Sequence, residues 1–205
     1  YGKLLLNEAG LPQSTGVSEK IGDQQADCML GWNNSFRYKN FALSFQIDGR
    51  LGGDIYSYTN YALQIAGRAE CTAPGGMREN FVVDGVIAQQ DGTYAPSTIK
   101  VSQQDYWQAI GTGNTGIGEA NIYDATNIRL RNIALNYSFP SSMLKKTIFQ
   151  QLKLGFSVNN VWMIYSDMNG IDPEAVFITN TNATGFENCA SPTSRSYLFN
   201  VTLGF

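Results

Sequence analysis

Five segments of the chain alternate between apolar and polar residues with a period of two, which is typical of a strand whose two faces meet different surroundings. These segments lie near residues 27–38, 41–55, 126–139, 151–164 and 194–205. Only Lys39 and Asn40 separate the first two, so we expect a hairpin with a tight turn. The pattern therefore predicts a protein built mainly of strands.

The third segment changes phase along its length. Ile128 and Leu130 alternate in one phase, whereas the apolar residues from Ile133 onward alternate in the other. The change falls at Arg131 and Asn132. Because one extra residue exchanges the two faces of a strand, this slip predicts a β-bulge.

Short and long connections alternate between these segments. The tight turn is followed by a long stretch at 56–125, and a short connection at 140–151 is followed by a long one at 166–193. In an up-and-down barrel this order places short turns at one rim and long loops at the other, as in outer-membrane barrels. The expected fold class is all-β, with transmembrane antiparallel strands of an up-and-down β-barrel and long extracellular loops.

A soluble β-sandwich also alternates, so a secreted adhesin or glycan-binding module of that fold is the alternative. A sandwich seldom gathers so many aromatic residues on one face while joining its strands by such long connections, because most connections in compact domains run about 4 to 6 residues. Strands of about 9 to 11 residues, tilted near 45°, are long enough to cross a membrane. These features favour the barrel.

Composition narrows the range of functions. Charged residues make up only 15% of the 205 residues, while 21 Gly, 11 Tyr and 11 Phe favour strands over helices. The absence of His removes the usual general base and the commonest metal ligand, so we expect no enzyme, no cofactor and no metal site. A net charge of -3 offers no basic face, so we expect no nucleic-acid partner.

The three cysteines lie far apart and lack the spacing of a zinc or thioredoxin-like motif. The sequence leaves open a disulfide between Cys71 and Cys189 as well as three separate thiols. A glycine motif, G-x-G-x-x-G, runs from Gly111 to Gly116, but it lacks the preceding strand and following helix of a nucleotide-binding unit. We interpret it as part of a flexible extracellular loop.

Two further clusters invite a binding interpretation. Four oxygen-bearing residues crowd one short run: Asp167, Asn169, Asp172 and Glu174. Their spacing is not that of a calcium-binding EF-hand, so a turn is the better interpretation. Tyr106 and Trp107, within the stretch at 56–125, would suit stacking on sugar rings or clasping a peptide, with packing within the loop as the alternative. They are the candidate contacts for substrate or partner.

Several motifs occur together and in a characteristic order. The run from Tyr123 to Pro140 contains D-A-T-N-I-R-L-R-N-I-A-L-N-Y and resembles the "DAS-Y-x-R-L-R-N" strand near the end of SusC/RagA-type TonB-dependent outer-membrane transporters. Further similar pieces are a hairpin at 31–41, "G-x-x-G-G-D-hydrophobic-Y" at 49–56, a strand at 158–162, "G-hydrophobic-D-P-E" at 170–174 and a closing segment at 191–205. The resemblance covers nearly the whole chain.

The chain departs from the family pattern in two small ways and one large way. Ala26-Asp27-Cys28 stands where the family has Pro, Asp and an aromatic residue, and Asn160-Val161 replaces Asn-Leu. The family's proteins are several times longer, with a plug domain and most of a barrel of about 22 strands before this point. The resemblance therefore implies the C-terminal portion of one barrel, residues 1–205, with the plug and TonB box absent.

The resemblance implies a role in TonB-dependent active uptake of glycan or peptide fragments. The implied partners are a SusD-like surface lipoprotein, the TonB complex through the missing N-terminal part, outer-membrane lipid, and an oligosaccharide or peptide substrate. It also allows a homodimer of the transporter-lipoprotein pair. Its implied location is the bacterial outer membrane, with the C-terminus at the periplasmic rim.

The last segment carries a further expectation. It ends on the aromatic Phe205 and alternates apolar residues behind it. By resemblance to outer-membrane proteins in general, this pattern is the signal read by the barrel-assembly machinery. The residues that form the signal are Tyr197, Phe199, Val201, Leu203 and Phe205.

Overall fold

In the computed structural model, the chain forms two compact units. The structure describes residues 2–111, 116–168, 170–176 and 181–205. The sheet unit comprises Gln24–Asp54, Asp124–Val176 and Ala190–Phe205, and the loop unit comprises Tyr1–Asp23, Ile55–Tyr123 and Phe177–Cys189. Each unit is therefore assembled from segments that are far apart in the sequence.

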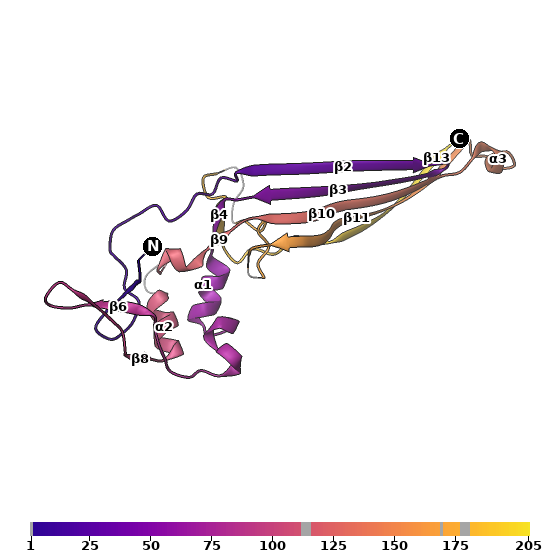
Figure 1. The fold of residues 1–205 in the computed structure, drawn as a ribbon. Coiled ribbons are helices and arrows are strands. Elements are labelled where there is room, and N and C mark those ends of the chain that lie inside the picture. The colour runs from indigo at the N-terminus through magenta and orange to yellow at the C-terminus, as the bar shows by residue number, and fades with distance from the viewer. Residues whose placement is uncertain (1, 112–115, 169, 177–180) are drawn as a thin grey trace. The chain divides into compact units, whose positions relative to one another are not determined.

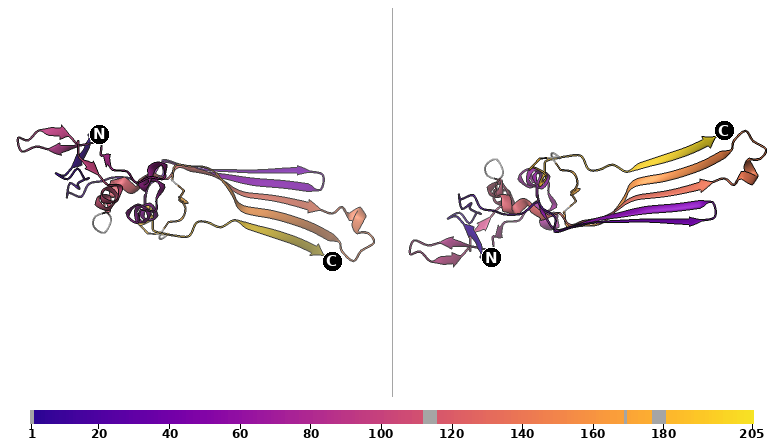
Figure 2. Two further views of the ribbon diagram at one scale, coloured as in Figure 1. Left: turned by 90° about the horizontal axis from the view of Figure 1, so that it is seen from below. Right: turned by 90° about the horizontal axis from the view of Figure 1, so that it is seen from above.

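The sheet unit is one antiparallel five-stranded sheet, in the order β13-β11-β10-β3-β2 (Figures 1 and 2). Its strands are β2 (Cys28–Tyr38), β3 (Phe41–Leu51), β10 (Asn127–Ser138), β11 (Gln151–Ser166) and β13 (Ser196–Gly204). The short helix α3 (Ser141–Leu144) lies between β10 and β11. Each strand coincides with one of the five alternating segments of the sequence.

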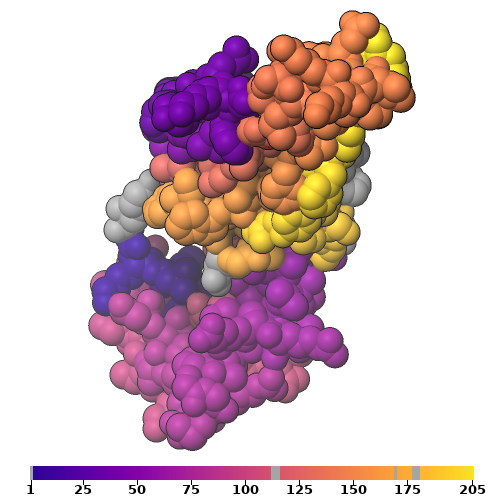
Figure 3. Space-filling model, turned by 90° about the vertical axis from the view of Figure 1, so that its right-hand side faces the viewer, coloured from indigo at the N-terminus to yellow at the C-terminus, as the bar shows by residue number. Residues whose placement is uncertain are grey.

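The short connections of the sheet unit share one end of the sheet. The two-residue turn between β2 and β3, the α3 connection and the C-terminus all lie there (Figures 1 and 2). Figure 3 views the molecule from this side, with the orange residues between β10 and β11 close to the yellow C-terminal residues. Lys39 makes the tight turn with a φ of 52°. The long connections leave from the opposite end.

The register of the ladders puts apolar side chains on one face of all five strands. Paired rows include Trp32 with Ile47, and Leu135 with Phe156. Aromatic rings meet within this face, as Phe156 and Phe199 do with centroids 4.8 Å apart. Its members include Leu30, Phe36, Tyr38, Phe41, Leu43, Phe45, Leu130, Ile133, Tyr137, Leu152, Leu154, Val158, Tyr197, Val201 and Leu203. We call this surface the apolar face.

The predicted β-bulge is present in β10. Leu130 pairs with Ile47, and the next paired residue is Asn132, opposite Gln46, so Arg131 is left out of the ladder. The extra residue brings Leu130 and Ile133 onto the same face despite their odd separation. The phase change in the sequence is therefore what keeps the apolar face continuous.

The loop unit has a fold of its own where the sequence predicts only long connections. Its described residues form α1 (Tyr58–Ile65), α2 (Gln103–Ile110) and three short 3-10 turns, η1 (Glu70–Thr72), η2 (Pro74–Gly76) and η3 (Gly118–Asn121). Both helices begin at a serine whose side chain accepts a backbone N–H: Ser57 from Asn60 and Ser102 from Asp105. No helix among the residues that the structure describes is long and apolar enough to cross a membrane.

Short strands complete the loop unit. They are β1 (Leu4–Leu6), β5 (Phe81–Val82), β6 (Gly85–Ala88), β7 (Tyr94–Pro96), β8 (Lys100–Val101) and β12 (Phe186–Glu187). Two further strands, β4 (Asp54–Ser57) and β9 (Ile122–Asp124), join β12 in a three-stranded sheet. Leu6 of β1, Val101 of β8 and Val83 form a small core in the loop unit, with Phe81 and Tyr106 packed against it.

The three cysteines form no disulfide in the structure. Cys28, Cys71 and Cys189 are exposed free thiols. The structure therefore contains three separate thiols and no bond between Cys71 and Cys189.

Substitution of Gly85 tests the packing of β1 against β6. A Cβ atom at this position would lie 2.6 Å from the Leu4 carbonyl oxygen and 2.8 Å from Leu6 Cδ1, so Gly85→Ala must push the two strands apart. We expect a loss of about 1–3 kcal/mol in local stability. Hydrogen exchange at the β1 and β6 amides of the full-length protein should accelerate. Gly2→Ala is the matched control, because nothing lies within 4 Å of its added methyl group.

Candidate functional site

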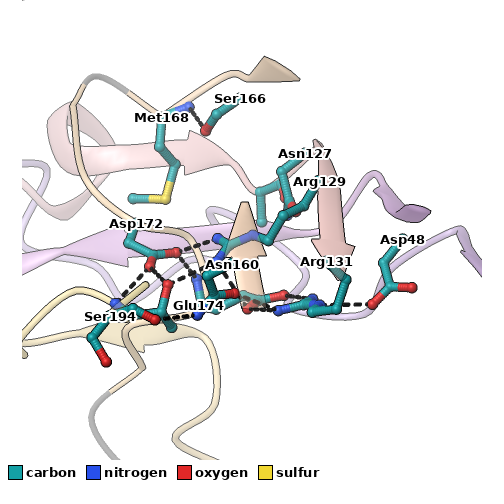
Figure 4. Close-up of polar contacts among 12 residues, drawn as sticks. Asp48, Asn127, Arg129, Arg131, Asn160, Ser166, Met168, Asp172, Glu174 and Ser194 are labelled. Carbon is teal, nitrogen blue, oxygen red and sulfur yellow. Dashed lines mark hydrogen bonds and ion pairs between the residues drawn. The ribbon is translucent and has the colours of Figure 1, made fainter. Parts of the chain in front are cut away.

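The polar face of the sheet carries most of its charge near the end from which the long connections leave. Along β3 and β10 the polar side chains are mainly amides and small residues, among them Ser44, Gln46, Asn132 and Asn136. The charged exceptions are Asp48, Arg50, Arg129 and Arg131. Arg129 and Arg131 bind the loop that follows β11, as Figure 4 shows.

Arg129 holds both ends of that loop. Its side chain is only 4% exposed, and its Nη2 donates to Oδ1 of Asp172 at 2.6 Å. Its Nη1 donates to Oγ1 of Thr193 at 2.7 Å and lies 3.3 Å from Oε2 of Glu174. One buried guanidinium thus connects the start of the loop with the segment that leads into β13.

Arg131, the bulge residue, makes a second set of contacts. Its Nε donates to Asp48 on the neighbouring strand at 2.8 Å, and its two terminal nitrogens donate to the two carboxylate oxygens of Glu174. This forked geometry is specific to a guanidinium group. The bulge therefore has a second consequence, since it places an extra arginine beside Asn132 on the polar face.

Asp172 is the most heavily hydrogen-bonded carboxylate of the cluster. It accepts from the backbone N–H and hydroxyl of Thr193 and from the backbone N–H of Glu174 at 3.0 Å, in addition to Arg129. Burial raises the pKa of Asp172, but these hydrogen bonds outweigh burial and lower the pKa to about 2. The carboxylate is consequently ionised across the physiological pH range.

These contacts define what we call the loop anchor: Asp48, Arg129, Arg131, Asp172, Glu174 and Thr193. Three carboxylates surround two guanidinium groups, so each charge has a partner. Removing one member of such a partly buried network destabilises the fold by more than the ion pair contributes to stability, because it leaves an opposite charge unpaired. The loop anchor fixes the loop against the polar face.

The oxygen-rich run from Asp167 to Glu174 thus has a structural role. Asp172 and Glu174 bind the arginines, and Asp167 accepts a hydrogen bond from the hydroxyl of Tyr165. Asn169 lies outside the described residues. Over the described part of the chain, no group of three or more His, Cys, Asp or Glu side chains is placed to hold a metal ion.

Tyr106 and Trp107 lie side by side at a cavity of the loop unit. Both lie on α2, with ring centroids 5.1 Å apart at 86°, and both line a cavity of about 490 Å³ in the loop unit. The glycine motif after α2 is preceded by this helix instead of a strand, and its residues 112–115 lie outside the described residues. The role of the two aromatic residues stays a prediction.

The five residues of the expected assembly signal lie at the C-terminal edge of the sheet. Tyr197, Phe199, Val201 and Leu203 belong to the apolar face, with Phe199 80% exposed, and Phe205 packs its ring 5.3 Å from that of Phe149. Their role in assembly stays a prediction.

A buried carboxylate that sequence reasoning missed organises the loop unit. Glu187 is 1% exposed and accepts from the Ser57 hydroxyl at 2.9 Å and from the Thr59 hydroxyl at 2.6 Å. It also accepts the backbone N–H of Thr59 at the start of α1. A carboxylate at this position complements the partial positive charge of a helix N-terminus. The paired residues are 128 and 130 positions apart, and no local pattern signals such a contact.

Comparison with known proteins places these features in context. No protein-family model matches the chain. The chain is 27% identical over 197 residues to "TonB-dependent receptor P3" of Formosa agariphila, covering 94% of the chain and 18% of the receptor. It is 29% identical to "TonB-dependent receptor P39" of the same organism, covering 90% of the chain and 17% of that receptor.

Solved structures show the same fold. The RagAB peptide importer in the "closed-closed" state aligns with 95% of the chain and 19% of the importer chain, at a TM-score of 0.60 and 15% identity. The "open-open" state aligns with 86% of the chain and 17% of the importer chain, at a TM-score of 0.57 and 16% identity. The chain thus spans less than a fifth of the length of the proteins that it matches.

Arg131→Lys tests the loop anchor. Lysine keeps the charge but cannot reproduce the two parallel hydrogen bonds to Glu174, so we expect anchoring to weaken by about 1 kcal/mol. Hydrogen exchange in residues 170–176 of the full-length protein should accelerate about fivefold. Arg37→Lys is the matched control, because Arg37 lies on the exposed strand β2. Equal exchange in both variants would rule out the anchoring role of the fork.

The pKa of Asp172 predicts a response to acid. Because the folded-state pKa of about 2 lies below the ordinary value of 3.8, the stabilisation by ionised Asp172 is complete above about pH 4 and is lost as the pH falls through about 2. Pepsin cleavage near residues 170–176 should therefore rise over this range in the wild-type protein. In Asp172→Asn, pepsin cleavage near residues 170–176 is compared with cleavage at another site of the same protein. This ratio should already be high at the upper end of the pH range and should not change as the pH falls.

The comparisons and the motifs agree. The curated relatives are TonB-dependent receptors, and the chain shares the fold of part of the RagAB peptide importer. The chain is accordingly a homologue of part of a TonB-dependent receptor, which confirms the resemblance to SusC/RagA-type TonB-dependent transporters predicted from the sequence.

Proposed function

We propose that the chain is part of the wall of an outer-membrane importer that takes up glycan or peptide fragments in a TonB-dependent manner together with a SusD-like lipoprotein. The observation that carries this proposal is the continuous apolar face on all five strands, opposite a polar face. In this role the sheet performs no catalysis. Its contribution is to separate lipid from a water-filled passage.

The dimensions of the sheet suit a membrane wall. Its shortest strand, β13, has 9 residues and spans about 30 Å at roughly 3.3 Å per residue. The apolar band of an outer-membrane barrel is about 25 Å tall, and tilted strands cross it. On the apolar face, Tyr38 is 72% and Phe199 80% exposed, which in water would be an unusually large apolar patch. Lipid would cover this face.

The connections supply the proposed orientation. The tight turn, α3 and the C-terminus share one end of the sheet, and short turns lie on the periplasmic side of outer-membrane barrels. The long connections would then be extracellular, where a surface lipoprotein could bind them. The loop anchor would hold the connection between β11 and β13 against the inner side of the wall.

The secreted-module alternative finds less support. A β-sandwich needs a second sheet packed on the apolar face of the first. Within the described residues of the sheet unit, all strands belong to one sheet. The two edge strands β2 and β13 would pair with further strands of a longer barrel.

A pair of lysine substitutions in β13 tests the proposal. Phe199→Lys places a charge on the proposed lipid face near the middle of the strand, at a cost of about 2–4 kcal/mol. Asn200→Lys places the same charge at the next residue, which lies on the polar face of the sheet. In the full-length protein we expect the first variant to lower the yield of folded barrel in the outer membrane and the second to leave it unchanged.

The opposite ranking, or equal yields, would contradict the assignment of the two faces. Import itself is tested by growth on peptide or oligosaccharide as sole nutrient. We expect growth to require both this protein and TonB.

A further inference from the structure

The cavity of the loop unit has the features of a ligand site. Its volume of about 490 Å³ falls within the range of about 300–1,000 Å³ typical of small-molecule pockets. Apolar side chains form much of its wall, among them Met77, Phe81, Tyr106 and Trp107, while Glu79 and Asn80 supply polar groups. A mixed lining of this kind allows both burial of a ligand and its orientation.

Contacts within the loop unit hold the aromatic wall in place. The ring of Tyr106 lies edge-on to Phe81, with centroids 5.2 Å apart, and packs against the core of Leu6, Val83 and Val101. Trp107 Nε1 donates to the Gln103 side chain at 3.2 Å. A wall that is already ordered loses little conformational entropy when a ligand binds.

Polar groups at the cavity are left for a ligand. Among the described residues, none forms a side-chain hydrogen bond or an ion pair with Glu79, Asn80 or the Tyr106 hydroxyl. Burial, and to a lesser extent the nearby Cys71, raises the pKa of Tyr106, so its hydroxyl stays a neutral donor. Glu79 and Asn80 are exposed, so a ligand can reach them. A few polar groups beside an apolar lining are typical of binding sites.

The charge of the site selects the kind of ligand. Glu79 is the only charged side chain among the described residues that line the cavity. The loop unit as a whole contains ten acidic and five basic residues. A carboxylate beside aromatic faces favours an ammonium or guanidinium group, which gains both an ion pair and cation–π attraction. An anionic glycan would be repelled, and a neutral glycan would leave the carboxylate unpaired.

We propose that this cavity binds a lysine or arginine side chain of an imported peptide. The inference rests on the proposed function and narrows its substrate class from glycan or peptide to peptides with basic residues. The concave shape suits a single inserted side chain better than the broad contact of a protein partner, which buries about 800 Å² on each side.

The test uses the full-length transporter in detergent and three probes. Two are tripeptides with acetylated and amidated ends, Gly-Lys-Gly and Gly-Glu-Gly, and the third is a neutral trisaccharide. Calorimetry should show that the lysine peptide binds at least tenfold more tightly than the other two. Equal affinities, or tightest binding of the trisaccharide or the acidic peptide, would overturn the inference.

Substitutions of three cavity residues, which we call the rim variants, test whether the peptide binds in this cavity. They are at Glu79, Asn80 and Trp107. We expect Glu79→Gln to weaken binding of the lysine peptide about threefold and Asn80→Asp to strengthen it about twofold, in line with exposed charge pairs. Trp107→Ala should weaken it about tenfold. The matched controls Glu8→Gln and Tyr94→Ala alter an exposed acid and an exposed aromatic residue away from the cavity, and should leave affinity unchanged. Unchanged affinity in all three rim variants would refute the site.

Two readouts distinguish failure of this inference from failure of the proposed function. If the wild-type protein supports TonB-dependent uptake but the rim variants bind and import the lysine peptide as well as the wild-type protein does, only the cavity assignment fails. If the wild-type protein supports no TonB-dependent uptake, the proposed function fails with it. If a lipoprotein copurifies with the wild-type protein and is lost from the rim variants while their peptide affinity is unchanged, the cavity belongs to the partner and the inference is overturned.

Discussion

The structure of the sheet unit depends on one constraint, which is that each strand presents unlike chemistry on its two sides. Side chains alternate with period two, so a single unmatched residue would move every following apolar side chain to the wrong face. The bulge at Arg131 meets this constraint, because it returns Leu130 and Ile133 to one face. The continuous apolar face, and with it the proposed contact with lipid, therefore depends on a local irregularity of the ladder.

The same bulge connects the wall to its loop. Arg131 leaves the ladder and forms a fork with Glu174, while Arg129 binds Asp172 and Thr193. The "D-P-E" motif and the "R-L-R-N" motif, which lie 43 positions apart, are thus two halves of one contact. Their joint occurrence in the sequence is explained by charge pairing on the polar face.

Features that arise from local periodicity could be predicted from the sequence. The five strands, the tight turn at Lys39 and the bulge all produce a regular or interrupted alternation that can be read directly. The helices of the stretch at 56–125 are only eight residues long, and a few apolar positions in so short a segment leave no clear period. Contacts such as Glu187 with Ser57 and Thr59 join distant segments and depend on tertiary packing alone. Tyr106 and Trp107 were identifiable as candidates, but their cavity also needs Glu79 and Phe81, which only the fold brings near.

The central claim is that the apolar face meets lipid and the polar face meets water. Spin labels placed one at a time along residues 196–204 of the full-length protein in a bilayer, with its cysteines replaced by serine, measure this directly. We predict alternation: labels at 197, 199, 201 and 203 should be accessible to oxygen dissolved in lipid, and labels at 198, 200 and 202 to a water-soluble nickel complex. Uniform access to the nickel complex along the strand would contradict the claim.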